Sequence, residues 1–199
     1  MEEKTLSEQE SFFVIEQMIA AAKNEYRQNG GGWLIWGWLL FLASINSIVL
    51  IEIDYTYYIQ WTWCSILPLG FLLMFFYNKR HSRQEVVTTY LQDLFRKFNI
   101  GFFVSLTVIV ASNFLGVPPN LSFGYFYILY AFWMFMNGSA LRFKPLIVGA
   151  IVNWCAAIAI FLVHDFKQIM IISAIAVLVG YLIPGQILSA KYKRSIKAA

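Results

Sequence analysis

WLIWGWLLFLASINSIVLIEI, residues 33–53, is an apolar stretch whose one charged residue, Glu52, lies next to its end. An α-helix rises about 1.5 Å per residue, so roughly 20 residues cross a hydrocarbon layer about 30 Å thick. Five further stretches have a similar length and character, and they cover residues 57–77, 100–117, 121–141, 145–163 and 169–188. The sequence therefore predicts a polytopic membrane protein with six spans.

The composition fits a lipid environment better than a soluble core. Hydrophobic residues make up 59% of the chain, charged residues make up 13%, and the mean hydropathy is +0.62. Soluble domains usually carry about 25% charged residues. Spanning segments must be helices or a closed barrel, and these runs lack the alternation of barrel strands. We expect an all-α fold.

Lys and Arg residues set the expected orientation. They cluster after spans two, four and six, at Lys79, Arg80, Arg83, Arg96, Lys97, Arg142, Lys144, Lys191, Lys193, Arg194 and Lys197, while Lys167 lies on the other side. The positive-inside rule then predicts cytoplasmic termini and three short outer loops at residues 52–56, 118–120 and 164–168. Topology and anionic lipid account for the net charge of +4, so we expect no nucleic-acid partner.

The polar segment before the first span is predicted to be a cytosolic amphipathic helix. Residues 1–32 are acidic and resemble no cleavable signal. Ser7 and Glu10 have the spacing of a capping box, and a glycine linker follows at residues 30–32. Apolar residues recur at helical spacing, and Phe12, Ile15 and Ile19 are our candidates for binding a protein partner.

A second cytosolic helix is predicted between spans two and three, over residues 82–99. Ser82 and Glu85 repeat the capping-box spacing, and apolar residues form a stripe along the segment. Residues 190–199 are expected to form a basic cytosolic tail. Two amphipathic helices on one side of the membrane favour a small cytosolic layer.

Motifs for hydrolytic, redox or phosphate chemistry are lacking in the sequence. His164 and Asp165 are the pair that most resembles an acid-base couple, but adjacent residues on a turn usually point apart. Cys64 and Cys155 lie in spans two and five without metal-ligand spacing, so free cysteines are expected. We therefore expect no catalytic, cofactor or metal site, and no enzymatic activity.

Amides are the most polar groups expected inside the spans. Each must find hydrogen bonds, and bonding between helices at roughly 0.6–2 kcal/mol per contact is the usual outcome. If a polar cavity exists instead, its candidate lining is Asn46, Asn113, Asn153 and Gln186. Asp, Glu, Lys, Arg and His are absent from the middle of all six spans, which disfavours ion-coupled transport.

Three local strings of the sequence are distinctive: residues 8–11 leading to Ile15, Met18 and Ile19, the Trp36-Gly37-Trp38 entry to span one, and residues 141–149. Together they resemble a group of small six-span bacterial inner-membrane proteins with no assigned activity. The resemblance implies a bacterial inner membrane and the same topology. It transfers no catalytic or binding residue.

Two functions follow as hypotheses. The first is a non-enzymatic membrane anchor or regulator whose cytosolic helices bind a protein partner, because those helices are amphipathic and the spans carry no buried charge. The alternative is a small, dimeric carrier or channel for an apolar or uncharged solute that uses the amide-bearing spans. An intramembrane enzyme ranks third.

Overall fold

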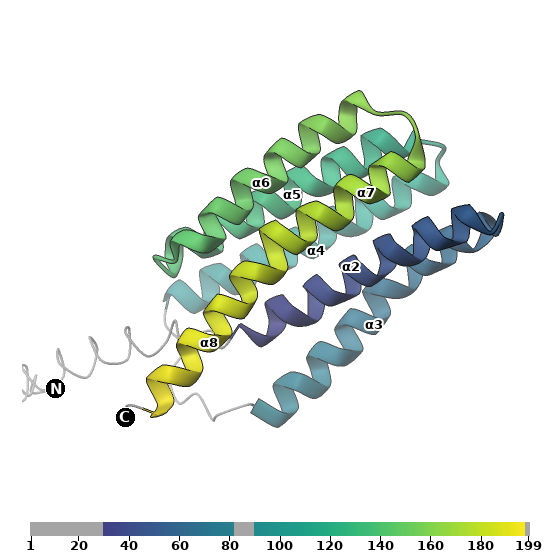
Figure 1. Cartoon of the computed structure of the whole chain (residues 1–199). Helices are drawn as coiled ribbons and strands as arrows, with labels where there is room; N and C mark the ends of the chain where they lie inside the picture. The colour runs from purple at the N-terminus through teal and green to yellow at the C-terminus, as the bar shows by residue number, and fades with distance from the viewer. Residues whose placement is uncertain (1–29, 82–89, 198–199) are drawn as a thin grey trace, which may run out of the picture.

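A computed structural model describes residues 30–81 and 90–197, and within these ranges the chain is helical and contains no strand. Figure 1 shows the helices gathered into one bundle. In chain order they are α2 (Gly31–Glu52), α3 (Tyr57–His81), α4 (Tyr90–Phe114), α5 (Pro119–Ala140), α6 (Lys144–Leu162), α7 (Phe166–Val177), the π-helical turn η1 (Leu178–Leu182) and α8 (Ile183–Lys197). The last three follow one another without a break. The all-α prediction is confirmed.

Five of the helical segments in the described ranges are long and apolar enough to cross a membrane. They are Gly31–Glu52, Tyr57–Arg80, Leu94–Phe114, Lys144–Leu162 and Phe166–Lys191. The remaining predicted span, the fourth, corresponds to α5, which has 22 residues and no charged side chain. This helix is not among the five, and Tyr125, Tyr127, Tyr130 and Asn137 interrupt its apolar run.

The surface of the bundle is also that of a membrane protein. Large apolar side chains are exposed around it, among them Phe75 at 62%, Val108 at 63% and Leu162 at 76%. Soluble monomers rarely expose contiguous apolar surface on this scale. Hydrocarbon accommodates such side chains without cost, so the protein is suited to a bilayer.

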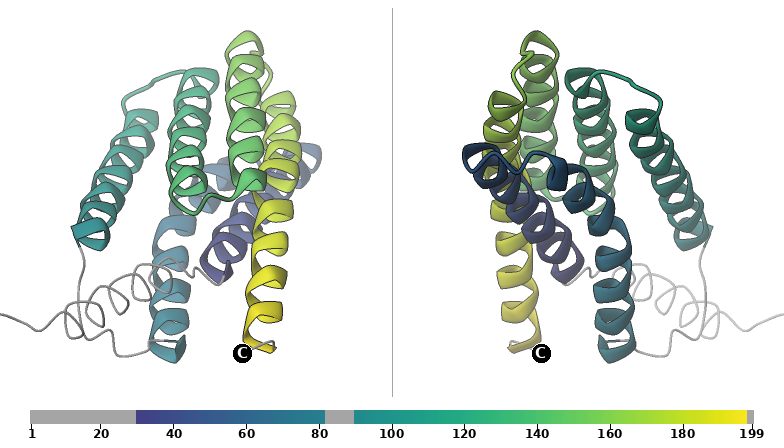
Figure 2. Two further views of the ribbon diagram at one scale, coloured as in Figure 1. Left: turned by 90° about the vertical axis from the view of Figure 1, so that its left-hand side faces the viewer. Right: turned by 90° about the vertical axis from the view of Figure 1, so that its right-hand side faces the viewer.

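The packing divides the bundle unevenly. α5 and α6 form the closest pair, and α2 lies between α3 on one side and α7 with η1 on the other. α4 packs against α5. Figure 1 shows α3 at the margin of the bundle beside α2, and Figure 2 shows α4 at the margin beside α5. The buried core accordingly lies among α2, α5, α6 and α7, where Leu40, Met134, Ile160 and Met170 are almost fully covered.

Glycine permits the closest crossing in this core. A Cβ on Gly149 of α6 would lie 2.1 Å from the carbonyl oxygen of Gly180 in η1. Pro184 has no N–H, so it cannot bond the Gly180 carbonyl four residues earlier. A π-helical turn just before this proline takes up the interruption. The sixth span therefore continues through Pro184 and does not end there.

The observed boundaries differ from the predicted ones at several places, and one of them is the predicted basic tail, where α8 stays helical to Lys197. α2 begins at Gly31, inside the predicted glycine linker, and buried Gly30 caps it at φ 71°. α4 runs without a break from Tyr90 to Phe114, so the last residues of the predicted 82–99 helix continue straight into the third span. Hydropathy marks where a membrane begins, and it does not mark a break in a helix. Residues 1–29, 82–89 and 198–199 lie outside the described residues, and they include nearly all of the first predicted cytosolic helix and the first eight residues of the second.

The two ends of the bundle differ in charge. Gly30 and the described end of α8 lie at one end, together with the basic residues that close α3 and flank the α5–α6 turn (Figure 1). We call this the proximal end. The turns α2–α3, α4–α5 and α6–α7 form the distal end, where Lys167 and Glu52 make an exposed ion pair between α7 and α2.

Candidate functional site

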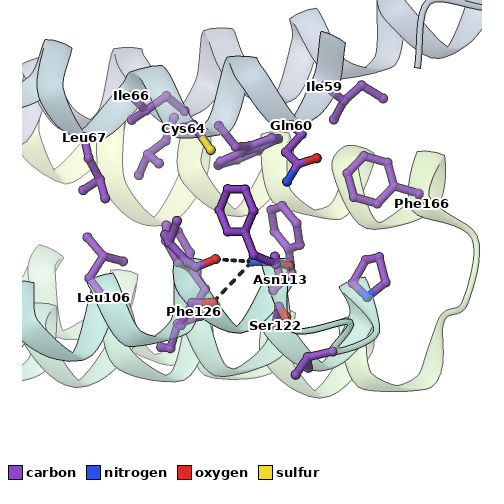
Figure 3. A pocket seen from close by; sticks show the side chains of 18 of the residues that line it. Ile59, Gln60, Cys64, Ile66, Leu67, Leu106, Asn113, Ser122, Phe126 and Phe166 are labelled. Carbon is purple, nitrogen blue, oxygen red and sulfur yellow. Dashed lines mark hydrogen bonds between the residues drawn. The ribbon is translucent and has the colours of Figure 1, made fainter. Parts of the chain in front are cut away.

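A cavity of about 460 Å³ opens in the distal half of the bundle, among α3, α4, α5 and the edge of α2 (Figure 3). This volume is in the range of small-molecule sites, about 300–1,000 Å³. Most of the lining is apolar and includes Leu40, Ile59, Trp63, Ile66, Leu67, Leu106, Phe123, Phe126 and Phe166. We call it the distal cavity.

The polar groups of the distal cavity are uncharged. Gln60 comes from α3, Asn113 from α4 and Ser122 from α5, and Figure 3 shows the three on facing walls. The Asn113 amide nitrogen donates to the carbonyls of Ile109 and Val110, at 3.2 and 3.4 Å. Its amide oxygen accepts no hydrogen bond from the residues that the structure describes.

Gln60 adds a second amide to this wall. Its side chain is exposed to the cavity and makes no hydrogen bond within the part of the chain that the structure describes. Acidic and basic side chains are absent from the described lining. An apolar cavity with a few convergent polar groups is the usual form of a ligand site.

A second cavity, also of about 460 Å³, lies in the proximal half of the bundle between the same helices. Its lining is more polar and includes three asparagines, Asn78, Asn99 and Asn137, from α3, α4 and α5. The Asn137 amide nitrogen donates to the Trp133 carbonyl at 2.8 Å. We call it the proximal cavity.

Aromatic side chains lie where the two cavities adjoin. Trp36 and Tyr130 line both of them. The Trp36 ring centre lies 5.9 Å from that of Phe71 on α3 and 5.8 Å from that of Phe103 on α4. The Phe71 and Phe103 rings are 4.7 Å apart. We call Trp36, Phe71 and Phe103 the aromatic barrier.

Gly70 makes room for this barrier. A Cβ at Gly70 would lie 2.4 Å from the Trp36 indole ring, so only glycine lets the indole rest against the α3 backbone. The indole is 8% exposed although it adjoins both cavities. Its position therefore depends on the α2–α3 contact and on the two phenyl rings.

The four predicted cavity residues do not come together. Asn113 lines the distal cavity, while Asn46 donates to the Thr62 hydroxyl at 3.0 Å on the α2–α3 face. Asn153 is buried in α6 and donates to the Gly149 carbonyl at 2.7 Å. Gln186 is exposed on α8 and lines neither cavity. Asn46 and Asn153 thus act within the packing of the helices.

The remaining predicted positions are placed as follows. Phe12, Ile15 and Ile19 lie outside the described residues. Asp165 caps α7 by accepting a hydrogen bond from the Lys167 backbone N–H at 3.1 Å, and this carboxylate has a structural role. Within the described ranges, no group of three or more His, Cys, Asp or Glu side chains could hold a metal ion.

Sequence reasoning missed Gln60, Asn78 and Asn99 as cavity residues. Gln60 is an amide inside an apolar run, and this was the available signal. It lies among the tyrosines and tryptophans at the start of α3, where a polar side chain looks interfacial. Asn78 and Asn99 lie next to charged residues, so they also look like residues of the membrane–water interface.

No family model matches the chain, and neither a curated protein nor a solved structure matches it. The geometry of the two cavities is therefore the basis for a functional assignment.

Proposed function

We propose that the protein binds an uncharged, largely apolar solute in the distal cavity and passes it to the proximal cavity when the aromatic barrier moves. The observation that supports this best is the pair of cavities of equal volume, which share Trp36 and Tyr130 as walls. A site that faces one end and then the other, around a movable barrier, is what a carrier needs.

The topology that we propose has six spans. α5 is the closest partner of α6, which is itself long and apolar enough to cross, and α5 contains no charged residue. With α5 crossing, all three distal turns lie on one side of the membrane. The basic residues of the proximal end favour the cytoplasm for that end, and the resemblance of the sequence implies a bacterial inner membrane.

The chemistry of the lining favours an uncharged solute. Carriers that couple transport to protons or ions generally keep ionisable groups on the pathway in spite of their cost. Both cavities have only neutral polar groups among the described lining residues. Amides and hydroxyls can orient a neutral molecule by hydrogen bonds without taking part in a reaction.

Osmotic swelling of proteoliposomes tests this function, with 1,2-hexanediol as an uncharged probe that has an apolar end. We expect uptake to be faster than in protein-free liposomes, to saturate with diol concentration, and to fall when the Cys64 thiol in the distal cavity is modified. A Cys64→Ser variant treated in the same way is the control. Rates equal to those of protein-free liposomes would contradict the proposal.

Partner binding through Phe12, Ile15 and Ile19 stays a prediction from the sequence, because these residues lie outside the described ranges. Replacement of all three by Ser should release a co-purifying companion if that prediction is correct. The same replacement should leave diol uptake unchanged.

A further inference from the structure

We infer that the solute is a single-chain amphiphile with an uncharged, hydrogen-bonding head, and that it enters the distal cavity sideways from the membrane, between α3 and α4. This inference rests on the proposed function and names the class of its solute. It is based on three observations: the separation of α3 from α4, the grading of polarity along the cavity, and the absence of charge in the described lining.

The seam between α3 and α4 is the least closed side of the bundle. α3 packs against α2, and α4 packs against α5, but α3 and α4 are not packed against each other along their lengths. Only 11% of the apolar window of each is buried, compared with 56% in the last span. α3 lies at the margin of the bundle in Figure 1, and α4 lies at the margin in both views of Figure 2.

Side chains alone bridge this seam, at the level of the aromatic barrier, where Phe71 of α3 meets Phe103 of α4. Toward the distal end, the space between the two helices is the distal cavity, lined by Cys64 and Leu67 on one side and Val110 on the other. In a bilayer this seam faces hydrocarbon. A molecule dissolved in the membrane therefore meets the cavity without first entering water.

Polarity changes along the cavity in the same direction as in a leaflet. Gln60 and Asn113 lie toward the distal end of α3 and α4, whereas Leu67 and Leu106 lie deeper (Figure 3). Seven residues separate Gln60 from Leu67, which is about 10 Å along a helix. In the membrane leaflet at the distal end, an amphiphile already has its head toward the water and its chain toward the middle of the bilayer. This order matches that of the cavity. The amphiphile can enter without turning over.

The two amides of the distal cavity determine which head group the amphiphile can have. The Asn113 amide oxygen is available to accept a hydrogen bond, and the Gln60 amide can both donate and accept. A hydroxyl or amide head satisfies both groups. A charged head would lose its hydration without meeting an opposite charge in the described lining, and this is costly. The volume of about 460 Å³ suits one chain better than the two chains of a phospholipid.

Photo-crosslinking in proteoliposomes tests the inference on the unaltered protein, with a 1-monoacylglycerol as the probe. A diazirine at the end of the acyl chain should label peptides that contain Leu67 or Leu106. A diazirine at the first chain carbons should label peptides that contain Gln60 or Asn113. The corresponding fatty acid, which has a charged head, should compete poorly. Labelling spread over the exposed faces of the bundle, or independent of diazirine position, would overturn the inference.

Matched variants test the two amides that are assigned to the head group. Gln60→Leu and Asn113→Leu should each weaken monoacylglycerol binding about fivefold, the equivalent of one lost hydrogen bond of about 1 kcal/mol. Gln186→Leu, at an exposed amide outside both cavities, should have no effect. Equal binding by all three variants would remove the assigned role of the two amides.

Two variants on α4 test the route by which the amphiphile enters. Val110→Trp adds bulk at the seam, and Val108→Trp adds the same bulk on the outer face, where Val108 is 63% exposed. We expect only Val110→Trp to abolish position-dependent labelling, and equal labelling of both variants would overturn sideways entry. If 1,2-hexanediol uptake persists while monoacylglycerol labels nothing, the lipid-like solute is wrong and the carrier proposal stands. Absence of both would overturn the carrier proposal itself.

Discussion

Replacing Gly149 with Ala should destabilise the bundle strongly for the addition of one methyl group. The new Cβ would lie 2.1 Å from the Gly180 carbonyl oxygen and 2.7 Å from the end of the Met134 side chain. An ordinary contact begins at about 3.4 Å, so α6 and η1 would have to separate by about 1.3 Å. The contact on the η1 side is backbone, and a backbone cannot rotate aside as a side chain can.

The magnitude follows from overpacking in a close-packed core, which costs typically 1–3 kcal/mol. We place Gly149→Ala in the upper half of this range, at about 2–3 kcal/mol, because the obstructing group is rigid. Separation of α6 from η1 would also loosen the packing around Asn153, whose amide nitrogen lies beside Gly180. The loss of packing therefore extends beyond the substituted position.

Gly101→Ala is the matched control, since a Cβ at Gly101 of α4 would meet nothing within 4 Å. Glycine costs roughly 0.5–1 kcal/mol relative to alanine inside a helix, so this variant should equal or exceed the wild type in stability. Reversible unfolding in mixed micelles, followed by tryptophan fluorescence, measures both variants. If Gly149→Ala and Gly101→Ala have the same free energy of unfolding, the close crossing of α6 and η1 is refuted.

Three further outcomes are expected. Trp36→Ala should join the two cavities, so that swelling in 1,2-hexanediol becomes faster and no longer saturates; an unchanged saturation curve would show that the indole is not the barrier. Tyr127→Phe removes the hydrogen bond that the Tyr127 hydroxyl donates to the Ser173 carbonyl at 3.0 Å, and should lower the free energy of unfolding by about 0.5–1.5 kcal/mol. Glu52→Gln breaks the exposed ion pair with Lys167 and should lower the free energy of unfolding by less than about 1 kcal/mol. The same assay in 1 M salt should show a smaller loss of stability, because salt screens exposed charges. A loss of stability that does not depend on salt would contradict the weak role of this pair.

Much of the fold could be predicted because long apolar runs end at recognisable residues. Helix α6 begins at Lys144, with Pro145 in its first turn, and α7 begins after Asp165, which caps it. These signals are local, and they set boundaries within a few residues. The continuity of α4 through Asn99 was missed because the amphipathic pattern and the apolar run were assigned to separate helices.

The cavities could not be predicted, because they depend on which helices pack together. Hydropathy describes each helix alone, and it gives no reason why α3 and α4, consecutive along the chain, should lie apart. Asn113 was a candidate because it is an amide in an apolar run. Asn153 is also an amide in an apolar run, yet its side chain lies at the close contact between Gly149 and Gly180 and is part of the helix packing. Only the three-dimensional arrangement distinguishes the two amides.

The central claim, a distal cavity that takes up a solute from the bilayer or the water above it, is tested most directly with the two native cysteines. Cys64 lines the distal cavity, whereas Cys155 is exposed on the outer face of α6, near the middle of that span. In washed proteoliposomes, a small uncharged maleimide, which reacts with a hydrated thiolate, should modify Cys64 in a Cys155→Ser variant and leave the hydrocarbon-facing Cys155 unmodified in a Cys64→Ser variant. Addition of 1,2-hexanediol should slow the reaction of Cys64. Equal reactivity of the two thiols, or a Cys64 rate that the diol does not change, would contradict the account.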